Sequence, residues 1–456
     1  MKLEIEEPSK LIFGKAPKPV KCKRGFSIGS GEVYPEINFT LPQMIIDDST
    51  WNEIKSMYSD LINEICRRAV DLKTPALVVE FELLPPMTVK PEWGAEITSI
   101  IAKSLEEHFQ KYGLKSALRA TPVDVRDSER PPLMRNGEMT EKMFHSFGLC
   151  ADAGADMLSI ESTGGKEVHD EALLNGDLAG IVFALGVLAV KDMGFLWNKI
   201  VEISSRKNLI AAGDTACGFA NTAMILADKG MLPKTLAAVD RSATIVRSLQ
   251  AYIEGAVGPS KDCAYEGPFI KAMTGIPISM EGKTSACAHL SSLGNIAAAC
   301  ADLWSNESVQ NVKLLSTFAP VVSLEQLIYD CRLMNQSLKE GIDSALKYRK
   351  WMVEGDAYLD PQAYVLKPDV VIRICKKIIE YKTPYEMTLG AVDETLKILR
   401  EASGIGEIKL TNIETRWLNM LSAQFDGIPG TEEAAFEMIR SGIYEGKFIP
   451  AEYEFT

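Results

Sequence analysis

The sequence lacks the signals of several large classes of protein. Its 456 residues carry a formal net charge of −13, with 62 acidic and 49 basic side chains and no long basic run. That balance argues against a nucleic-acid partner and mainly promotes solubility. The longest apolar run, Leu178 to Val190, is shorter than the roughly 20 residues that span a bilayer. We therefore expect a buried helix there and no membrane association.

Marks of secretion are also missing. Residues 1–7 are charged and contain no apolar core of a signal peptide. The nine cysteines are odd in number and show no paired spacing, at positions 22, 66, 150, 217, 263, 287, 300, 331 and 375. These features predict reduced thiols and a cytoplasmic location.

Several catalytic signatures are absent as well. The chain has no Walker loop, no GxSxG elbow and no HExxH helix. Hydrolase and phosphoryl-transfer functions therefore lack their usual motifs. A doubly wound sheet is disfavoured too, because no glycine-rich phosphate turn follows the first strand.

What the sequence does contain is an alternation of short apolar strands with helices. Such alternation indicates βα units and a parallel sheet. Seven or eight strands favour closure, so the predicted fold is an α/β TIM (β/α)8 barrel with an additional helical C-terminal layer. The expected strands cover residues 76–82, 116–121, 157–161, 209–213, 235–239, 276–280 and 313–318. The expected helices before residue 230 cover 49–72, 94–113, 137–153 and 172–206, and another begins near residue 221.

Three parts are predicted along the chain. Residues 1–47 are rich in Pro, Gly and Lys and predict an irregular extension or short hairpin. The barrel is expected over residues 48–325. Residues 326–456 show only helical patterns, so we expect an extension that stays outside the barrel and covers it or binds a partner.

Three expected strand ends carry side chains that bind metals. Glu161 ends one apolar run, and Cys217 and Cys263 follow two others. Strands of a parallel barrel end on one rim, so these side chains are expected to converge. A carboxylate and two thiols suit zinc, and three protein ligands leave a fourth position open for a substrate.

Each ligand also has an ordinary interpretation. Glu161 alone is compatible with a rim acid bonded to loop amides, and buried cysteines commonly fill apolar space. Cys287, two residues before His289, is a rival third ligand. From the residues alone, zinc binding and plain packing both remain open.

Longer segments resemble the methanol–corrinoid protein methyltransferase family. The resemblance spans almost the whole chain and is carried by unusual strings at residues 34–38, 93–96, 164–168, 212–215, 254–266, 280–283, 304–309 and 360–364. The extreme N-terminus and the last helices match only loosely.

The resemblance implies a zinc-carrying TIM barrel whose ligands fall on Glu161, Cys217 and Cys263. It also implies a separate corrinoid-binding subunit, hence a hetero-oligomer, with methanol as substrate. In that chemistry zinc polarises the methanol C–O bond, and the Co(I) corrinoid on the partner attacks the methyl group. The departing oxygen needs a proton, for which Asp214 is the first candidate and Glu82 the second.

Three other functions remain to be distinguished. A zinc thiol methyltransferase would accept methyl from a methyl-corrinoid. A metal-free barrel enzyme, such as a decarboxylase, would contain no stoichiometric zinc. A helical adaptor that only docks the corrinoid subunit would need no ligands at strand ends.

Overall fold

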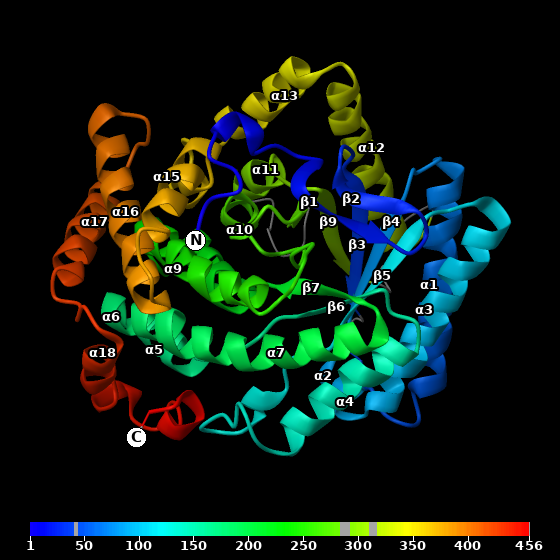
Figure 1. Cartoon of the computed structure of the whole chain (residues 1–456), viewed down its shortest axis with the longest axis horizontal. Coiled ribbons are helices and arrows are strands. Elements are labelled where there is room, and N and C mark those ends of the chain that lie inside the picture. Colours follow the sequence, from blue (N-terminus) through cyan, green and yellow to red (C-terminus); the bar gives the residue numbers. More distant parts are fainter. Residues whose placement is uncertain (41–43, 283–291, 310–316, 456) are drawn as a thin grey trace.

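The computed structural model describes residues 1–40, 44–282, 292–309 and 317–455 (Figure 1). Its main sheet has seven strands in the order β7-β6-β5-β4-β3-β9-β8, and all neighbouring pairs are parallel. The strands are β3 (Tyr34–Thr40), β4 (Leu77–Glu82), β5 (Ser116–Thr121), β6 (Met157–Ile160), β7 (Ile210–Asp214), β8 (Ser279–Glu281) and β9 (Leu303–Val309). A separate hairpin, β1 (Lys15–Cys22) with β2 (Phe26–Ser30), precedes them.

An irregular segment joins the two edges of this sheet. The backbone N–H of Val257 donates to the carbonyl of Ala211 at 2.8 Å, so the segment pairs with β7. On its other side, the N–H of Ser279 in β8 donates to Ser260 Oγ at 3.2 Å. Residues 257–260 therefore fill an eighth position, which gives the TIM-barrel-like arrangement that the sequence predicts.

The barrel interior is unusually polar. Arg119 on β5 is fully buried and donates from Nε to Glu36 Oε1 on β3 at 2.9 Å. Its Nη1 donates to Ser159 Oγ at 2.9 Å and to the carbonyl of Ser260 at 3.0 Å. Because buried charges are costly unless paired, this network ties four barrel positions together.

Amphipathic helices cover the outside of the barrel. In α1 (Trp51–Asp71), Ile54, Tyr58, Leu61 and Ile65 recur at helical spacing and are buried. The other helices around the barrel are α2 (Pro85–Val89), α3 (Pro91–Tyr112), α4 (Glu138–Asp152), α5 (Lys166–Asn175), α8 (Thr222–Asp228), α9 (Lys234–Ile253), α10 (Gly267–Thr274), α11 (Ser292–Ala298) and α12 (Ala319–Lys339).

The apolar run at Leu178 lies in a continuous helical segment of 30 residues, Leu178–Lys207. It consists of α6 (Leu178–Phe183), a π-helical turn (Ala184–Leu188) and α7 (Ala189–Lys207). By length and composition it could cross a membrane, but 78% of its apolar window is buried inside the fold. The expected buried helix is confirmed. It begins later than predicted because Gly176, with φ of 62°, ends α5 and Asp177 caps a new helix.

A further layer of helices covers the side of the barrel formed by α5 to α10 (Figure 1). Thr395 on α16 donates to Ser242 Oγ on α9 at 2.8 Å, so α9 is enclosed between this layer and the barrel. The layer consists of α14 (Pro361–Val365), α15 (Pro368–Ile378), α16 (Pro384–Ile405), α17 (Asn412–Phe425) and α18 (Glu432–Ile439), whereas α13 (Ile342–Glu354) packs against α11 and α12.

The structure corrects several local expectations. Residues 235–239 are not a strand but lie in α9. This helix is buried on nearly all sides, so a short apolar stretch of it has the same sequence pattern as a buried strand. Residues 34–40, expected to be irregular or part of a hairpin, form β3. The strand expected at 276–280 begins only at Ser279, and residues 313–316 lie outside the described residues.

The helical tail also needs one correction. The predicted boundary after residue 325 falls inside α12, which packs against β3 and β9 and so belongs to the barrel. The sequence did not reveal this boundary because its helical pattern continues from α12 into the following helix without a clear break. The division into three parts otherwise stays a prediction.

Candidate metal centre

The three predicted ligands meet at one end of the barrel. Glu161 follows β6, Cys217 opens a π-helical turn (Cys217–Asn221) after β7, and Cys263 follows the irregular eighth segment. Their nearest ligand atoms all lie within 4.8 Å of one another. Cys263 Sγ lies 3.1 Å from Glu161 Oε1. Three neighbouring barrel positions thus present one carboxylate and two sulfur atoms to a common point.

This arrangement fits a zinc ion. Bonds of about 2.0 to 2.3 Å in a tetrahedron place neighbouring ligand atoms roughly 3.4–3.8 Å apart. Cys263 is buried, whereas Cys217 and Glu161 are partly exposed, so the group has a closed side and an accessible side. The alternative ligand Cys287, with His289, lies outside the described residues.

Two polar side chains hold the cysteine loops in place. The backbone N–H of Cys217 donates to Thr215 Oγ1 at 3.1 Å, and that hydroxyl lies 3.6 Å from Cys263 Sγ. Asn221 donates from Nδ2 to Cys217 Sγ at 3.5 Å and to the carbonyl of Cys263 at 3.2 Å. Such contacts fix the orientation of metal ligands.

Lys261 is the cation beside this group, and its side chain is only 1% exposed. Its Nζ lies 3.1 Å from Glu161 Oε1, 2.8 Å from Asp262 Oδ1 and 3.9 Å from Cys263 Sγ. Burial alone would lower the pKa of Lys261. The negative charges of Asp262, Cys263 and the strand acids outweigh burial and raise that pKa well above its usual value.

Two carboxyl groups face the same space and hold protons readily. Burial raises the pKa of Glu82, at the end of β4, to about 7, against the opposing charge of Lys261. The pKa of Glu307, on β9, is raised to about 8, mainly by burial and to a lesser extent by the negative charge of Glu82. Sequence reasoning missed Glu307, although Ser305 and Glu307, at alternate positions of β9, signal an inward-facing polar row.

Asp214 serves as an acceptor within a closed network. Its Oδ1 accepts hydrogen bonds from Arg247 at 3.0 Å and from the backbone N–H of Ser162 at 3.2 Å. Its Oδ2 accepts from Trp197 Nε1 at 2.9 Å. These contacts connect the loops that carry Glu161 and Cys217. The proton-donor roles of Asp214 and Glu82 stay predictions.

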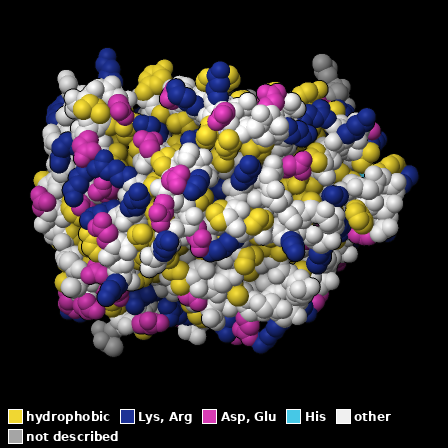
Figure 2. Space-filling model, turned by 45° about the horizontal axis from the view of Figure 1, so that its top comes forward, with side chains coloured by type: hydrophobic (Ala, Val, Ile, Leu, Met, Phe, Trp, Pro, Cys, Tyr) yellow, Lys and Arg dark blue, Asp and Glu magenta, His cyan; other side chains and the backbone are white. Residues whose placement is uncertain are grey.

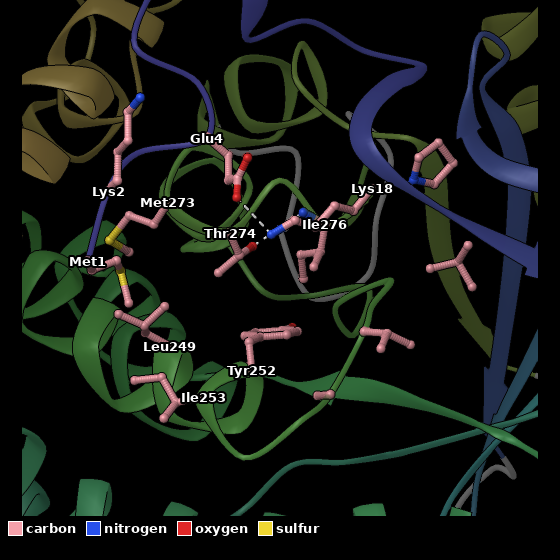
Figure 3. A pocket seen from close by; sticks show the side chains of 14 residues that line it. Met1, Lys2, Glu4, Lys18, Leu249, Tyr252, Ile253, Met273, Thr274 and Ile276 are labelled. Atoms are coloured by element: carbon pink, nitrogen blue, oxygen red, sulfur yellow. Dashed lines mark hydrogen bonds and ion pairs between the residues drawn. The ribbon is translucent and has the colours of Figure 1, made fainter. Parts of the chain in front are cut away.

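A cavity of about 630 Å³ lies at the opposite end of the barrel, beside the β1–β2 hairpin (Figure 3). Its wall is mainly apolar, from residues such as Leu249, Ile253 and Met273, with a 2.8 Å ion pair between Lys18 and Glu4. The residues that line it include none of the expected ligands. This cavity therefore has no part in the candidate metal centre.

On the face shown in Figure 2, acidic and basic side chains are interspersed. A single-sign patch, as a nucleic-acid site requires, is not seen on that face.

Comparison with known proteins identifies the family of the chain. The family model of the methanol-cobalamin methyltransferase B subunit matches residues 1–454. The chain belongs to this family. A methanol–corrinoid protein co-methyltransferase of Methanosarcina barkeri is 38% identical over 424 residues, covering 92% of this chain and 90% of the relative.

A solved structure agrees with this membership. The crystal structure of the methanol:cobalamin methyltransferase complex from Methanosarcina barkeri contains a chain of 35% identity that superposes with a TM-score of 0.94 and 99% coverage of both chains. The resemblance drawn from the sequence strings, and the barrel it implies, are thereby confirmed. The chain is a methyltransferase B subunit by family.

Proposed function

We propose that this chain takes the methyl group of methanol at a zinc ion held by Glu161, Cys217 and Cys263. It passes that group to the Co(I) corrinoid of a separate partner subunit. Family membership supports the reaction, since the curated relative is named a methanol–corrinoid protein co-methyltransferase. The observation that carries the zinc assignment is the convergence of the three ligand atoms within 4.8 Å at one barrel end.

Methanol needs activation because hydroxide is a poor leaving group. Zinc, when bound, acts as a Lewis acid that draws electron density from the methanol oxygen. In the net reaction the C–O bond breaks, and the cobalt electron pair forms the new C–Co bond. The oxygen leaves with the C–O pair and takes up one proton to become water.

Glu82 supplies that proton in this scheme. A carboxyl group with a pKa near 7 is half protonated at neutral pH, which suits general-acid catalysis. Glu307, with a pKa of about 8, holds a second proton in the same space and shares its titration with Glu82. Lys261 forms an ion pair with Glu82 and so keeps this carboxyl at the site.

The corrinoid partner is expected to dock at the barrel end that holds the ligands, because the corrinoid must reach the methyl carbon. The solved relative is a complex of this kind by name. Thiolate ligands must also stay reduced, which supports a cytoplasmic location.

The test combines metal content with turnover. Purified protein should contain one zinc per chain and methylate a reduced corrinoid protein with methanol, followed by the change in corrinoid absorbance. Gel filtration of the two proteins together should give a larger species. Turnover with a thiol acceptor and methyl-corrinoid, but none with methanol, would replace this proposal with the thiol methyltransferase. Turnover without metal would contradict the zinc site.

A further inference from the structure

We propose that Lys261 is a positioning residue that offsets the negative charge of the metal ligands and so keeps the metal electrophilic. This inference rests on the proposed function. It assigns to Lys261 an effect on the strength of the metal as a Lewis acid, exerted through Glu161 and Cys263 and not by contact with the substrate.

The position of Lys261 Nζ supports this role. On one side it lies 3.1 Å from Glu161 Oε1 and 3.9 Å from Cys263 Sγ. On the other side are Glu80, Glu82 and Asp262, whose ligand atoms also lie within 4.8 Å of one another. The ammonium group contacts all three, at 3.5 Å from Glu80 and 2.8 Å from Asp262.

The two groups of anions differ in chemistry. The group with two thiols and a carboxylate suits zinc, whereas three carboxylates would suit a hard cation. Lys261 provides the positive charge of the second group from within the chain. Asp262 in turn holds the ammonium charged, and contacts with all three acidic side chains fix it against the first group.

Charge balance shows why the first group needs such a neighbour. Two thiolates and one carboxylate around Zn²⁺ leave a net charge of −1, which makes a weaker Lewis acid than a zinc ion with neutral ligands. A buried ammonium 3.1 Å from the carboxylate draws charge from that ligand. The effect is strong because Lys261 is enclosed and poorly screened by water.

This role predicts opposite changes in two measurable quantities. Removing the positive charge removes a repulsion toward Zn²⁺, so zinc affinity should stay the same or rise by up to about tenfold. Methyl transfer from methanol should fall at least about tenfold, because the metal polarises the oxygen less. A residue that only supports the local fold would lower zinc affinity and methyl transfer together.

The experiment compares Lys261→Gln with Lys261→Arg in the full chain, loaded with zinc and mixed with the corrinoid protein. Zinc affinity is measured by competition with a chromophoric chelator. The thiolate-to-metal absorption of the cobalt(II)-substituted protein checks that both cysteines still bind. Arg keeps the charge, so Lys261→Arg should retain most of the transfer activity and the wild-type affinity.

Lys271→Met is the matched control. Lys271 is also fully buried and ion-paired, at 2.9 Å from Asp302 Oδ2, but its other partners are the carbonyls of Ile12 and Cys300. This variant should lose stability while its folded fraction keeps wild-type zinc affinity and transfer.

The inference is overturned if zinc-loaded Lys261→Gln transfers methyl groups at the wild-type rate. It is equally overturned if zinc affinity and transfer fall together in that variant, or if Lys261→Arg loses as much activity as Lys261→Gln. Should the Gln variant not fold, the Arg variant decides by itself, because loss of its transfer activity contradicts a role of charge. Failure of the wild-type protein to bind zinc or use methanol would instead refute the proposed function.

Discussion

Glu161 Oε1 and Cys263 Sγ lie 3.1 Å apart although 102 residues separate them in the chain. Glu161 follows β6, and Cys263 follows the irregular segment at the eighth barrel position. Cys217 follows β7, which lies between these two. The fold therefore brings the donor set together, and the substitutions below test what that set does.

Cys217→Ala and Cys263→Ala should each lose zinc and methyl transfer together, because two remaining ligands cannot hold zinc tightly. Metal content after dialysis and the rate of corrinoid methylation measure the two effects. Cys150→Ala is the matched control, since Cys150 is a fully buried thiol on α4, outside the ligand group. Full activity with unchanged zinc in either ligand variant would show that the assignment is wrong.

The rate of methyl transfer should fall as pH rises through about 7. Burial raises the pKa of Glu82 to about 7, so this carboxyl is protonated below that pH and loses its proton above it. Glu82→Gln should be much slower, by about 100-fold for loss of a general acid, and should lack this limb of the profile. Glu307 shifts the apparent midpoint toward its own pKa of about 8 because the two groups titrate together.

The control for that profile is Glu129→Gln, an exposed acid that should leave it unchanged. A transfer rate that increases from pH 6 to pH 8 would rule out Glu82 as the acid, since a deprotonated donor cannot be the active form.

Asp214→Asn should lower the free energy of unfolding by about 3–5 kcal/mol, because it leaves the buried charge of Arg247 unpaired. Trp197→Phe removes one hydrogen bond to Asp214 and part of a fully buried ring, and should cost about 2–3 kcal/mol. Urea unfolding measures both. If Asp214→Asn were as stable as the wild type and kept its zinc but lost transfer, Asp214 would be the proton donor after all.

Gly164→Ala should destabilise the protein by about 3 kcal/mol and weaken zinc binding. A Cβ at Gly164 would lie 2.3 Å from Asp192 Oδ2, which is ion-paired with Arg126, and Gly164 closely follows Glu161. Gly148→Ala, on α4, is the matched control. No described atom lies within 4 Å of its new Cβ, so this variant should be about 0.5–1 kcal/mol more stable. Equal stability of the two variants, by thermal or urea unfolding, would contradict the steric argument.

The sequence predicted the ligand group because the carboxyl ends of parallel strands meet on one rim. Glu161, Cys217 and Cys263 each follow an apolar run, so no long-range information was needed to bring them together. The barrel followed from the same alternation of strands and helices. Burial of the run at Leu178 followed from its limited apolar length.

Other features depend on tertiary contacts that a local pattern does not contain. Residues 235–239 are buried on nearly all sides within α9, so their apolar run has no helical period. The eighth barrel position has only a few backbone hydrogen bonds around Gly258 and Pro259, which do not resemble a strand in sequence. The role of Lys261 emerges only when acids from β4 and the loop after β6 surround it.

Because the segment 257–260 closes the barrel beside β7, the three candidate metal ligands lie at adjacent barrel positions. The opposite half of this barrel end is left to Glu82 on β4 and Glu307 on β9. In the proposed reaction, one half of the barrel wall holds the ion and the other half shapes the space around the alcohol. Enlarging side chains on the far half should change which alcohols enter while the ion stays in place. The range of alcohols that this protein accepts can therefore change without a change in its metal ligands.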